Sequence, residues 1–295
     1  LSKHIEEVLK MVIHLLTESV FPEQELSLSK SIITQNLKVN EEKTSFVAGR
    51  LFRKTLFGDH PYGSELNEES IHAITRNNLS SYHQSRLVNF TAIASGNITE
   101  SLTKKLINVL NQLPAKNTDQ IVRSFTTPPP APLHQTKEGS VQTTFRFGKG
   151  LVNRLHPDFF DVTFLPHLLG GYFGSRLMKN IREDIGLTYG IYASVNPLLR
   201  DSFFVIGADV NRENRELTIQ EIRSEIKQLI DNPVPAEELT TAKNHFIGSL
   251  QAEVTTIFAQ GEKFKTVLLN SLPATYYQDM VNRVETITAY DLQRK

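Results

Sequence analysis

The chain has 295 residues, of which 39% are hydrophobic and 22% are charged. This composition is typical of a folded globular protein of about two domains, since one domain usually takes about 100–200 residues. Thirty-two basic residues balance thirty-two acidic ones, so net charge favours neither nucleic acid nor an anionic membrane as a partner. No apolar run reaches the roughly 18 residues that a membrane span needs.

The sequence contains no cysteine, which excludes disulfides, thiolate metal sites and cysteine nucleophiles. Residues 1–4 lead directly into a helical pattern and do not resemble a secretory signal. Neither observation selects a compartment, because a cysteine-free soluble protein can reside in the cytoplasm or in the periplasm. Localisation is therefore left open.

The first half of the chain is mainly helical in pattern. Apolar residues at helical spacing predict a helix over residues 5–16. A second helix is predicted to start after Phe21-Pro22, because proline suits the first helical turn. Further along, residues 89–95 read as a strand and residues 100–113 as a helix.

The middle of the chain is rich in proline. Residues 126–132 read Thr-Thr-Pro-Pro-Pro-Ala-Pro, which predicts an extended linker within residues 119–137. After this linker, the patterns predict strands over residues 141–147, 188–195 and 202–210. They predict helices over residues 158–169, 173–184, 212–231 and 236–270.

The second half repeats a pattern of the first, 213 positions further on. A constant offset over about seventy positions suggests duplication, although apolar positions at helical spacing also match by chance. We therefore expect a first domain (1–118), the linker (119–137) and a homologous second domain (138–295), with the chain truncated at both ends. The matched pairs are Leu9 with Ile222, Leu26 with Leu239, Lys30 with Lys243, Ile33 with Phe246, Leu37 with Leu250, Ile74 with Ile287, and Leu79 with Leu292.

Two stretches resemble a known family. Residues 56–63 read Leu-Phe-Gly-Asp-His-Pro-Tyr-Gly, and residues 170–189 contain Gly-Gly-Tyr-Phe-Gly-Ser-Arg-Leu followed by Arg-Glu-Asp-Ile-Gly-Leu-Thr-Tyr. Both resemble the insulinase/pitrilysin metallopeptidases, which include the mitochondrial processing peptidases. The resemblance implies an α+β fold of the LuxS/processing-peptidase-like metallohydrolase kind. It implies two homologous domains, each a mostly antiparallel sheet covered by helices, around a peptide chamber.

The zinc site of this family is not matched. Family enzymes bind zinc through an inverted H-x-x-E-H helix and a glutamate on a later helix, but no two of the nine histidines here lie four residues apart. On the later helix, the resemblance aligns Asn36 with the ligand glutamate and Ser29 with a second acidic residue. An amide and a hydroxyl are poor substitutes for anionic oxygens. We therefore expect no metal in this chain, and zinc in a partner subunit.

The resemblance also assigns an arginine and a tyrosine, seven residues apart, to substrate binding. Here these are Arg182 and Tyr189. A guanidinium and a phenol can both hydrogen-bond a substrate carbonyl and stabilise the oxyanion that develops on it. The alternative is that Arg182 pairs with a local acid and Tyr189 only begins a strand.

A glycine-rich segment precedes this pair. Its spacing does not fit a phosphate-binding loop. The resemblance assigns Gly170, Gly171, Phe173 and Gly174 to substrate binding, because the zinc-less subunit of mitochondrial processing peptidase handles substrate with a glycine-rich loop at the corresponding place. The alternative is that these glycines let a helix lie close to a strand.

The remaining histidines carry weaker signals. His14 and Glu18 are spaced for a contact on a helix surface. His156 and His167 bracket a predicted helix, which favours packing or surface positions over a metal site.

These observations lead to one functional hypothesis and two alternatives. The chain is expected to be a non-catalytic subunit that binds peptide by strand addition and supplies Arg182 and Tyr189 to a zinc-bearing homologue in a heterodimer. The first alternative is a self-sufficient zinc endopeptidase whose metal motif lies upstream. The second is a structural scaffold without peptidase activity. A second copy of this chain is the other partner that the sequence allows.

Overall fold

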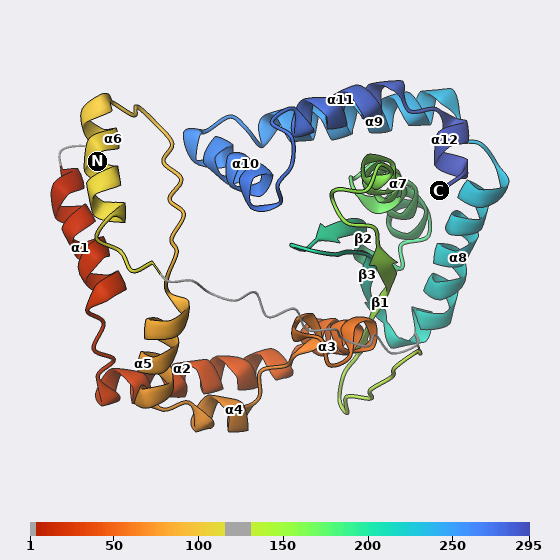
Figure 1. Cartoon of the computed structure of the whole chain (residues 1–295). Coiled ribbons are helices and arrows are strands. Elements are labelled where there is room, and N and C mark those ends of the chain that lie inside the picture. Colours follow the sequence, from red (N-terminus) through yellow and green to blue (C-terminus); the bar gives the residue numbers. More distant parts are fainter. Residues whose placement is uncertain (1–3, 116–130) are drawn as a thin grey trace. The chain divides into compact units, whose positions relative to one another are not determined.

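The computed structural model describes residues 4–115 and 131–295, which form two compact units (Figure 1). The first unit comprises Leu1–Glu42 and Glu65–Phe125, and the second comprises Lys43–Ser64 and Thr126–Lys295. These units are defined by packing. The predicted halves, 1–118 and 138–295, are instead defined by their expected origin from one duplicated domain, and this stays a prediction. Residues 119–130 of the predicted linker lie outside the described residues.

The first unit contains only helices in its described part. A strand needs a neighbouring strand for its hydrogen bonds, and the described part of this unit has none. The strand predicted over residues 89–95 is therefore wrong, since these residues form no regular element. The predicted helix over 100–113 ends three residues earlier. The helices are α1 (Ile5–Thr17), α2 (Glu23–Glu41), α4 (Glu68–Ala73), α5 (Arg76–Arg86) and α6 (Glu100–Leu110).

The second unit combines helices with one small antiparallel sheet, so the fold class is α+β, as the sequence predicted. Its strands are β1 (Gln142–Leu151), β2 (Thr188–Pro197) and β3 (Ser202–Asn211). Its helices are α3 (Thr44–Phe57), α7 (Phe159–Gly170), α8 (Arg215–Asp231), α9 (Ala236–Ala252), α10 (Ile257–Leu269), α11 (Tyr276–Thr286) and α12 (Ala289–Gln293).

The sheet has the order β1-β3-β2, with β3 in the centre and antiparallel to both neighbours. The three strands confirm the predicted ones, although each extends beyond the predicted bounds. The β1–β3 ladder is regular along its whole length. The β2–β3 ladder has a bulge between Thr188 and Ile191, which changes the direction of the side chains at the start of β2.

Two predicted helices are interrupted. The helix predicted over 236–270 is two helices, because Val254, Thr255 and Thr256 are consecutive β-branched residues of low helix propensity. The Thr256 hydroxyl then caps α10 by accepting a hydrogen bond from the Ala259 amide at 3.2 Å. The helix predicted over 212–231 begins with the 3₁₀ turn Arg212–Asn214 before α8.

The helix predicted over 173–184 starts later and is wider than an α-helix. Gly171 and Gly174, both poor helix formers, lie in a turn. Helical structure begins at Arg176 and continues as the π-helix Met178–Asp184. The amide of Ile185 donates to the carbonyl of Asn180, five residues back, at 3.0 Å. Such π-turns are uncommon in helices and occur often at functional sites.

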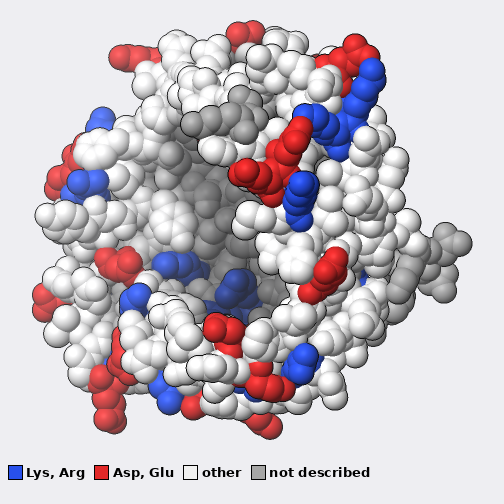
Figure 2. Space-filling model, turned by 90° about the vertical axis from the view of Figure 1, so that its left-hand side faces the viewer, with Lys and Arg blue, Asp and Glu red and all other residues white. Residues whose placement is uncertain are grey.

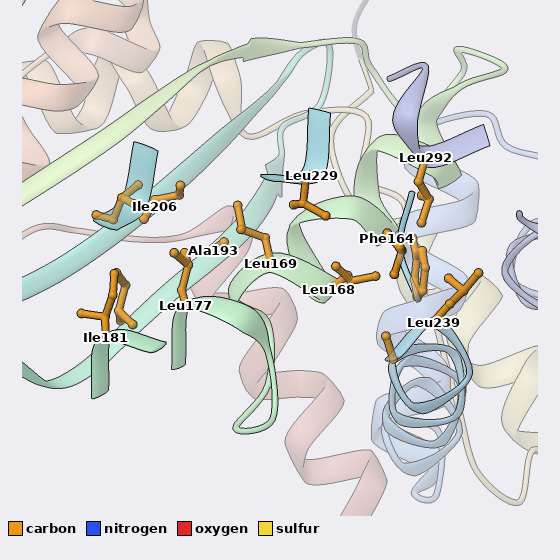
Figure 3. Close-up of a cluster of buried hydrophobic side chains, with 14 of the residues drawn as sticks. Phe164, Leu168, Leu169, Leu177, Ile181, Ala193, Ile206, Leu229, Leu239 and Leu292 are labelled. Atoms are coloured by element: carbon orange, nitrogen blue, oxygen red, sulfur yellow. The ribbon is translucent and has the colours of Figure 1, made fainter. Parts of the chain in front are cut away.

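The core of the second unit lies between α7 and the sheet. Phe164 and Leu168 of α7 have no exposed area, and neither does Ile206 of the central strand. Figure 3 shows Phe164 and Leu168 of α7 in one cluster with Leu229 of α8 and Leu239 of α9. Burying one such side chain stabilises the fold by about 1.5–3 kcal/mol, so α7 is an integral part of this core.

Candidate functional site

The predicted pair, Arg182 and Tyr189, lines one surface hollow of about 780 Å³ in the second unit. Arg182 comes from the π-helix and Tyr189 from the start of β2. The rest of the hollow is formed at one end of the sheet, where Gln142 of β1, Thr188 of β2 and Asp209 of β3 lie. Residues from all three strands thus contribute to a single open cavity.

The guanidinium of Arg182 lies over the ring of Phe173. Its Cζ is 4.6 Å from the ring centroid, a cation–π contact. Within the described ranges, no carboxylate lies within ion-pair distance of Arg182. The alternative in which a local acid neutralises Arg182 is therefore not seen in this part of the chain. Its N–H donors remain available to a ligand.

Tyr189 projects outward from the bulge, with 95% of its surface exposed. The Thr188 hydroxyl holds this bulge, because it donates to the carbonyl of Asp209 at 2.6 Å and accepts from the amide of Gly190 at 3.2 Å. Gly186, with a φ of 73°, makes the reversal between the π-helix and β2, a conformation that glycine adopts without strain. The turn and the bulge together bring Tyr189 to the same hollow as Arg182.

The glycines of residues 170–174 have different surroundings. A Cβ on Gly170 would lie 2.6 Å from the amide nitrogen of Ala193, so only glycine lets α7 lie this close to β2. A Cβ on Gly171 would lie 2.5 Å from the Cα of His167. Gly174 is exposed, and a Cβ there would meet only the side chain of Tyr172. Packing thus accounts for Gly170 and Gly171, while a role of this segment in substrate binding remains a proposal.

The two positions aligned with the family carboxylates, Ser29 and Asn36, are both exposed on α2. Over residues 4–115 and 131–295, no group of three His, Asp or Glu side chains is placed to hold a metal ion. A hydroxyl and a neutral amide do not fit the zinc site of the family. That this chain binds no zinc stays a prediction.

One pair of imidazoles was not found by sequence reasoning. His167 of α7 and His245 of α9 approach with Nε2 and Nδ1 3.1 Å apart. The ring of Tyr172 stacks against His167 with centroids 5.2 Å apart. Burial, helped by the neighbouring His245, lowers the pKa of His167 to about 4. His167 is therefore neutral at neutral pH, in agreement with its predicted packing role.

The lowered pKa makes the stability of the second unit pH-dependent. Between pH about 4 and pH about 6.5, the unfolded chain binds a proton at His167 that the folded chain does not. The free energy of unfolding should therefore rise with pH across this window, by at most about 1.4 kcal/mol per pH unit from this group. Urea unfolding of wild type and His167→Gln at several pH values measures the effect. The wild-type curve should be steeper, and parallel curves would contradict the assignment.

On the face shown in Figure 2, acidic and basic side chains are interspersed without an extended area of one sign. None of the helices in the described part of the chain is both long enough and apolar enough to cross a membrane.

Comparison with known proteins gives one consistent result. Residues 73–246, more than half of the chain, match the family model of the peptidase M16 inactive domain. The chain is 26% identical over 260 residues to the "uncharacterized zinc protease YmxG" of Bacillus subtilis (strain 168), covering 85% of this chain and 62% of that protein. It is 22% identical over 299 residues to the "non-peptidase homolog YmxG" of Helicobacter pylori, covering 99% and 69%.

A solved structure supports the same fold. The crystal structure of a peptidase M16 inactive domain from Pseudomonas fluorescens superposes with a TM-score of 0.84 at 24% identity, covering 98% of this chain and 71% of that one. The chain spans less than two thirds of the length of the Bacillus relative, 62%. As the resemblance of residues 56–63 and 170–189 to the insulinase/pitrilysin peptidases predicted, the chain belongs to the peptidase M16 inactive-domain family.

Proposed function

We propose that the chain is a non-catalytic M16 subunit that binds an extended peptide and presents Arg182 and Tyr189 to the zinc site of another M16 protein. One observation carries this proposal. A guanidinium without a carboxylate partner in the described residues and a phenol that is 95% exposed line the same hollow. Solvent-facing aromatic and arginine side chains that converge on one hollow favour a ligand-binding role.

The chemistry of the pair fits a peptide carbonyl. The planar guanidinium of Arg182 offers several N–H donors, and the hydroxyl of Tyr189 offers one more. Donors positioned near a scissile carbonyl stabilise the oxyanion of the transition state. β2 starts at the hollow and is an edge strand of the sheet, so an extended peptide can add to it through main-chain hydrogen bonds. Zinc and the general base belong to the partner protein.

We further propose that the two halves of the chain arose by duplication of one M16 domain. Polar contacts support this, because helical periodicity alone does not reproduce them. Lys30 Nζ donates to the carbonyl of His72 at 3.0 Å, and Lys243 Nζ donates to that of Glu285 at 2.9 Å. The two lysines are 213 positions apart, and so are the two residues whose carbonyls they contact. Thr75 caps α5 and its counterpart, Thr288, caps α12.

A second candidate function rests on the Bacillus relative, whose name includes a zinc protease. In that case, the metal motif lies in the part of the relative that has no match in this chain. The whole protein then cleaves peptides by itself. The name of the Helicobacter relative, a non-peptidase homolog, supports the non-catalytic proposal instead. A scaffold without any role in proteolysis is the third possibility.

Reconstitution separates these functions. We expect the purified chain with zinc to cleave no unstructured peptide alone, and to raise the cleavage rate of a zinc-bearing M16 homologue by about 10²-fold, the effect of supplying oxyanion donors. The increase should saturate at one chain per homologue. Cleavage by the chain alone would support a self-sufficient enzyme, and an unchanged rate in the mixture would support the scaffold.

A further inference from the structure

The first unit carries an apolar groove of about 560 Å³. Several apolar side chains on it face solvent, among them Leu15, which is 61% exposed, and Ile33, which is 44% exposed. Single exposed apolar residues are common, but a contiguous apolar groove marks a binding surface. Among the lining residues that have apolar counterparts under the 213-residue offset are Leu26, Ser29, Ile33, Ile71, Ile74 and Leu79.

In the second unit, the six counterparts surround α7. They are Leu239, Ala242, Phe246, Val284, Ile287 and Leu292, and all belong to the core cluster or pack against it. Figure 3 shows Leu239 and Leu292 beside Phe164 of α7. The surface that is an open groove in the first unit is therefore filled by a helix in the second. At three of the six positions the two units carry the same residue, leucine twice and isoleucine once.

We propose that the groove of the first unit is the docking site of a helix of the α7 type. Such a helix presents apolar side chains at the spacing of Phe164, Leu168 and Leu169, as an amphipathic helix does when it binds in an apolar groove. The proposal rests on the duplication proposed above. It goes beyond the peptide site, because none of the groove residues belongs to the hollow that contains Arg182.

Charge complementarity specifies the occupant further. In the second unit, Arg176 lies six residues beyond the end of α7 and forms a bidentate pair with Glu238 of α9, at 2.6 and 2.8 Å. The counterpart of Glu238 is Glu25, which lines the groove and forms no ion pair with any described residue. The docking helix should therefore be followed, at the same distance, by an arginine that pairs with Glu25.

A second copy of this chain does not supply the helix. Phe164 and Leu168 have no exposed area in their own core, and removing one such side chain from a core is strongly destabilising. The helix belongs instead to a segment of M16 proteins that lies outside the region similar to this chain. The Bacillus relative contains such sequence, because the chain covers only 62% of it.

The experiment uses a labelled synthetic peptide with the sequence of residues 157–178 of this chain, which contains α7 and Arg176. Fluorescence anisotropy of the peptide is measured as the whole 295-residue chain is added. We expect saturable binding at one peptide per chain. Ile33→Asp should weaken this binding at least about tenfold, since it places a charge on the apolar groove. Ile32→Asp is the matched control, because Ile32 is 52% exposed and lies outside the groove.

A charge exchange tests the ion pair. The peptide variant Arg176→Glu should bind wild type several-fold more weakly, and Glu25→Arg in the chain should restore its binding. Absence of saturable binding, or equal binding by Ile33→Asp and Ile32→Asp, would overturn the proposal. Circular dichroism shows whether both variants keep the wild-type helix content. Arg182→Ala should bind the helical peptide like wild type, so that failure of the groove and failure of the peptide-cleavage proposal are observed separately.

Discussion

Replacing Arg182 with alanine should lower kcat/KM for peptide cleavage by the reconstituted pair by about 10²-fold, the typical effect of losing one oxyanion donor. Arg182 has no ion pair among the described residues, so the substitution removes its donors from the hollow without leaving an acid unpaired. The free energy of unfolding of the chain should fall by no more than about 1 kcal/mol, because the substitution also removes the cation–π contact with Phe173. Single-turnover kinetics would assign the loss to binding or to the chemical step.

Three variants serve as controls for this result. Arg182→Lys keeps the charge but loses the planar fork of donors, so it should recover only part of the rate. Tyr189→Phe removes one hydroxyl and should also lower the rate. Arg223→Ala, an exposed position on α8, should cleave like wild type. If Arg182→Ala also cleaves at the wild-type rate, the proposed role of this chain in trans is wrong.

Periodicity predicted the elements whose burial pattern is simple. The helices α7 and α8 and the strands β2 and β3 lie within a few residues of their predicted bounds. Each has one side or both sides in the same core, so its apolar residues recur at the period of the element. The family resemblance added the fold class, because periodicity does not give the order of strands in a sheet.

Elements that depend on distant partners were predicted poorly. Residues 89–95 have the composition of a strand, but no neighbouring strand exists in the described part of their unit. The π-helix after Gly174 packs against β2, with Ile181 in the same core cluster as Ile191. Local sequence determines propensity, whereas these features follow from tertiary contacts.

The candidate site shows the same division. The family resemblance, and not the residues alone, assigned Arg182 and Tyr189 to one site, and both line the same hollow. The contact between His167 and His245 was missed because 78 residues separate the two positions. A single sequence holds no signal for such a pair, since each histidine alone resembles a packing or surface residue.

Two phenylalanines nine residues apart should respond to alanine in opposite ways. Phe164 has no exposed area and contacts the ring of Phe246 with centroids 5.6 Å apart. Phe164→Ala should therefore lower the free energy of unfolding of the second unit by about 3–5 kcal/mol, the cost of a large cavity in a core. Urea unfolding can be monitored by hydrogen exchange of the backbone amides in α7 and the sheet. This measures the loss for the second unit alone.

Phe173, in contrast, is 57% exposed and lies under the guanidinium of Arg182. Phe173→Ala should lower the free energy of unfolding by no more than about 1 kcal/mol. It removes a cation–π contact worth about 0.5–1 kcal/mol at an exposed site, so Arg182 becomes less well positioned and cleavage by the reconstituted pair should fall a few-fold. If Phe173→Ala instead destabilises the unit as strongly as Phe164→Ala, Phe173 has a structural role. Its assignment to substrate binding would then be wrong.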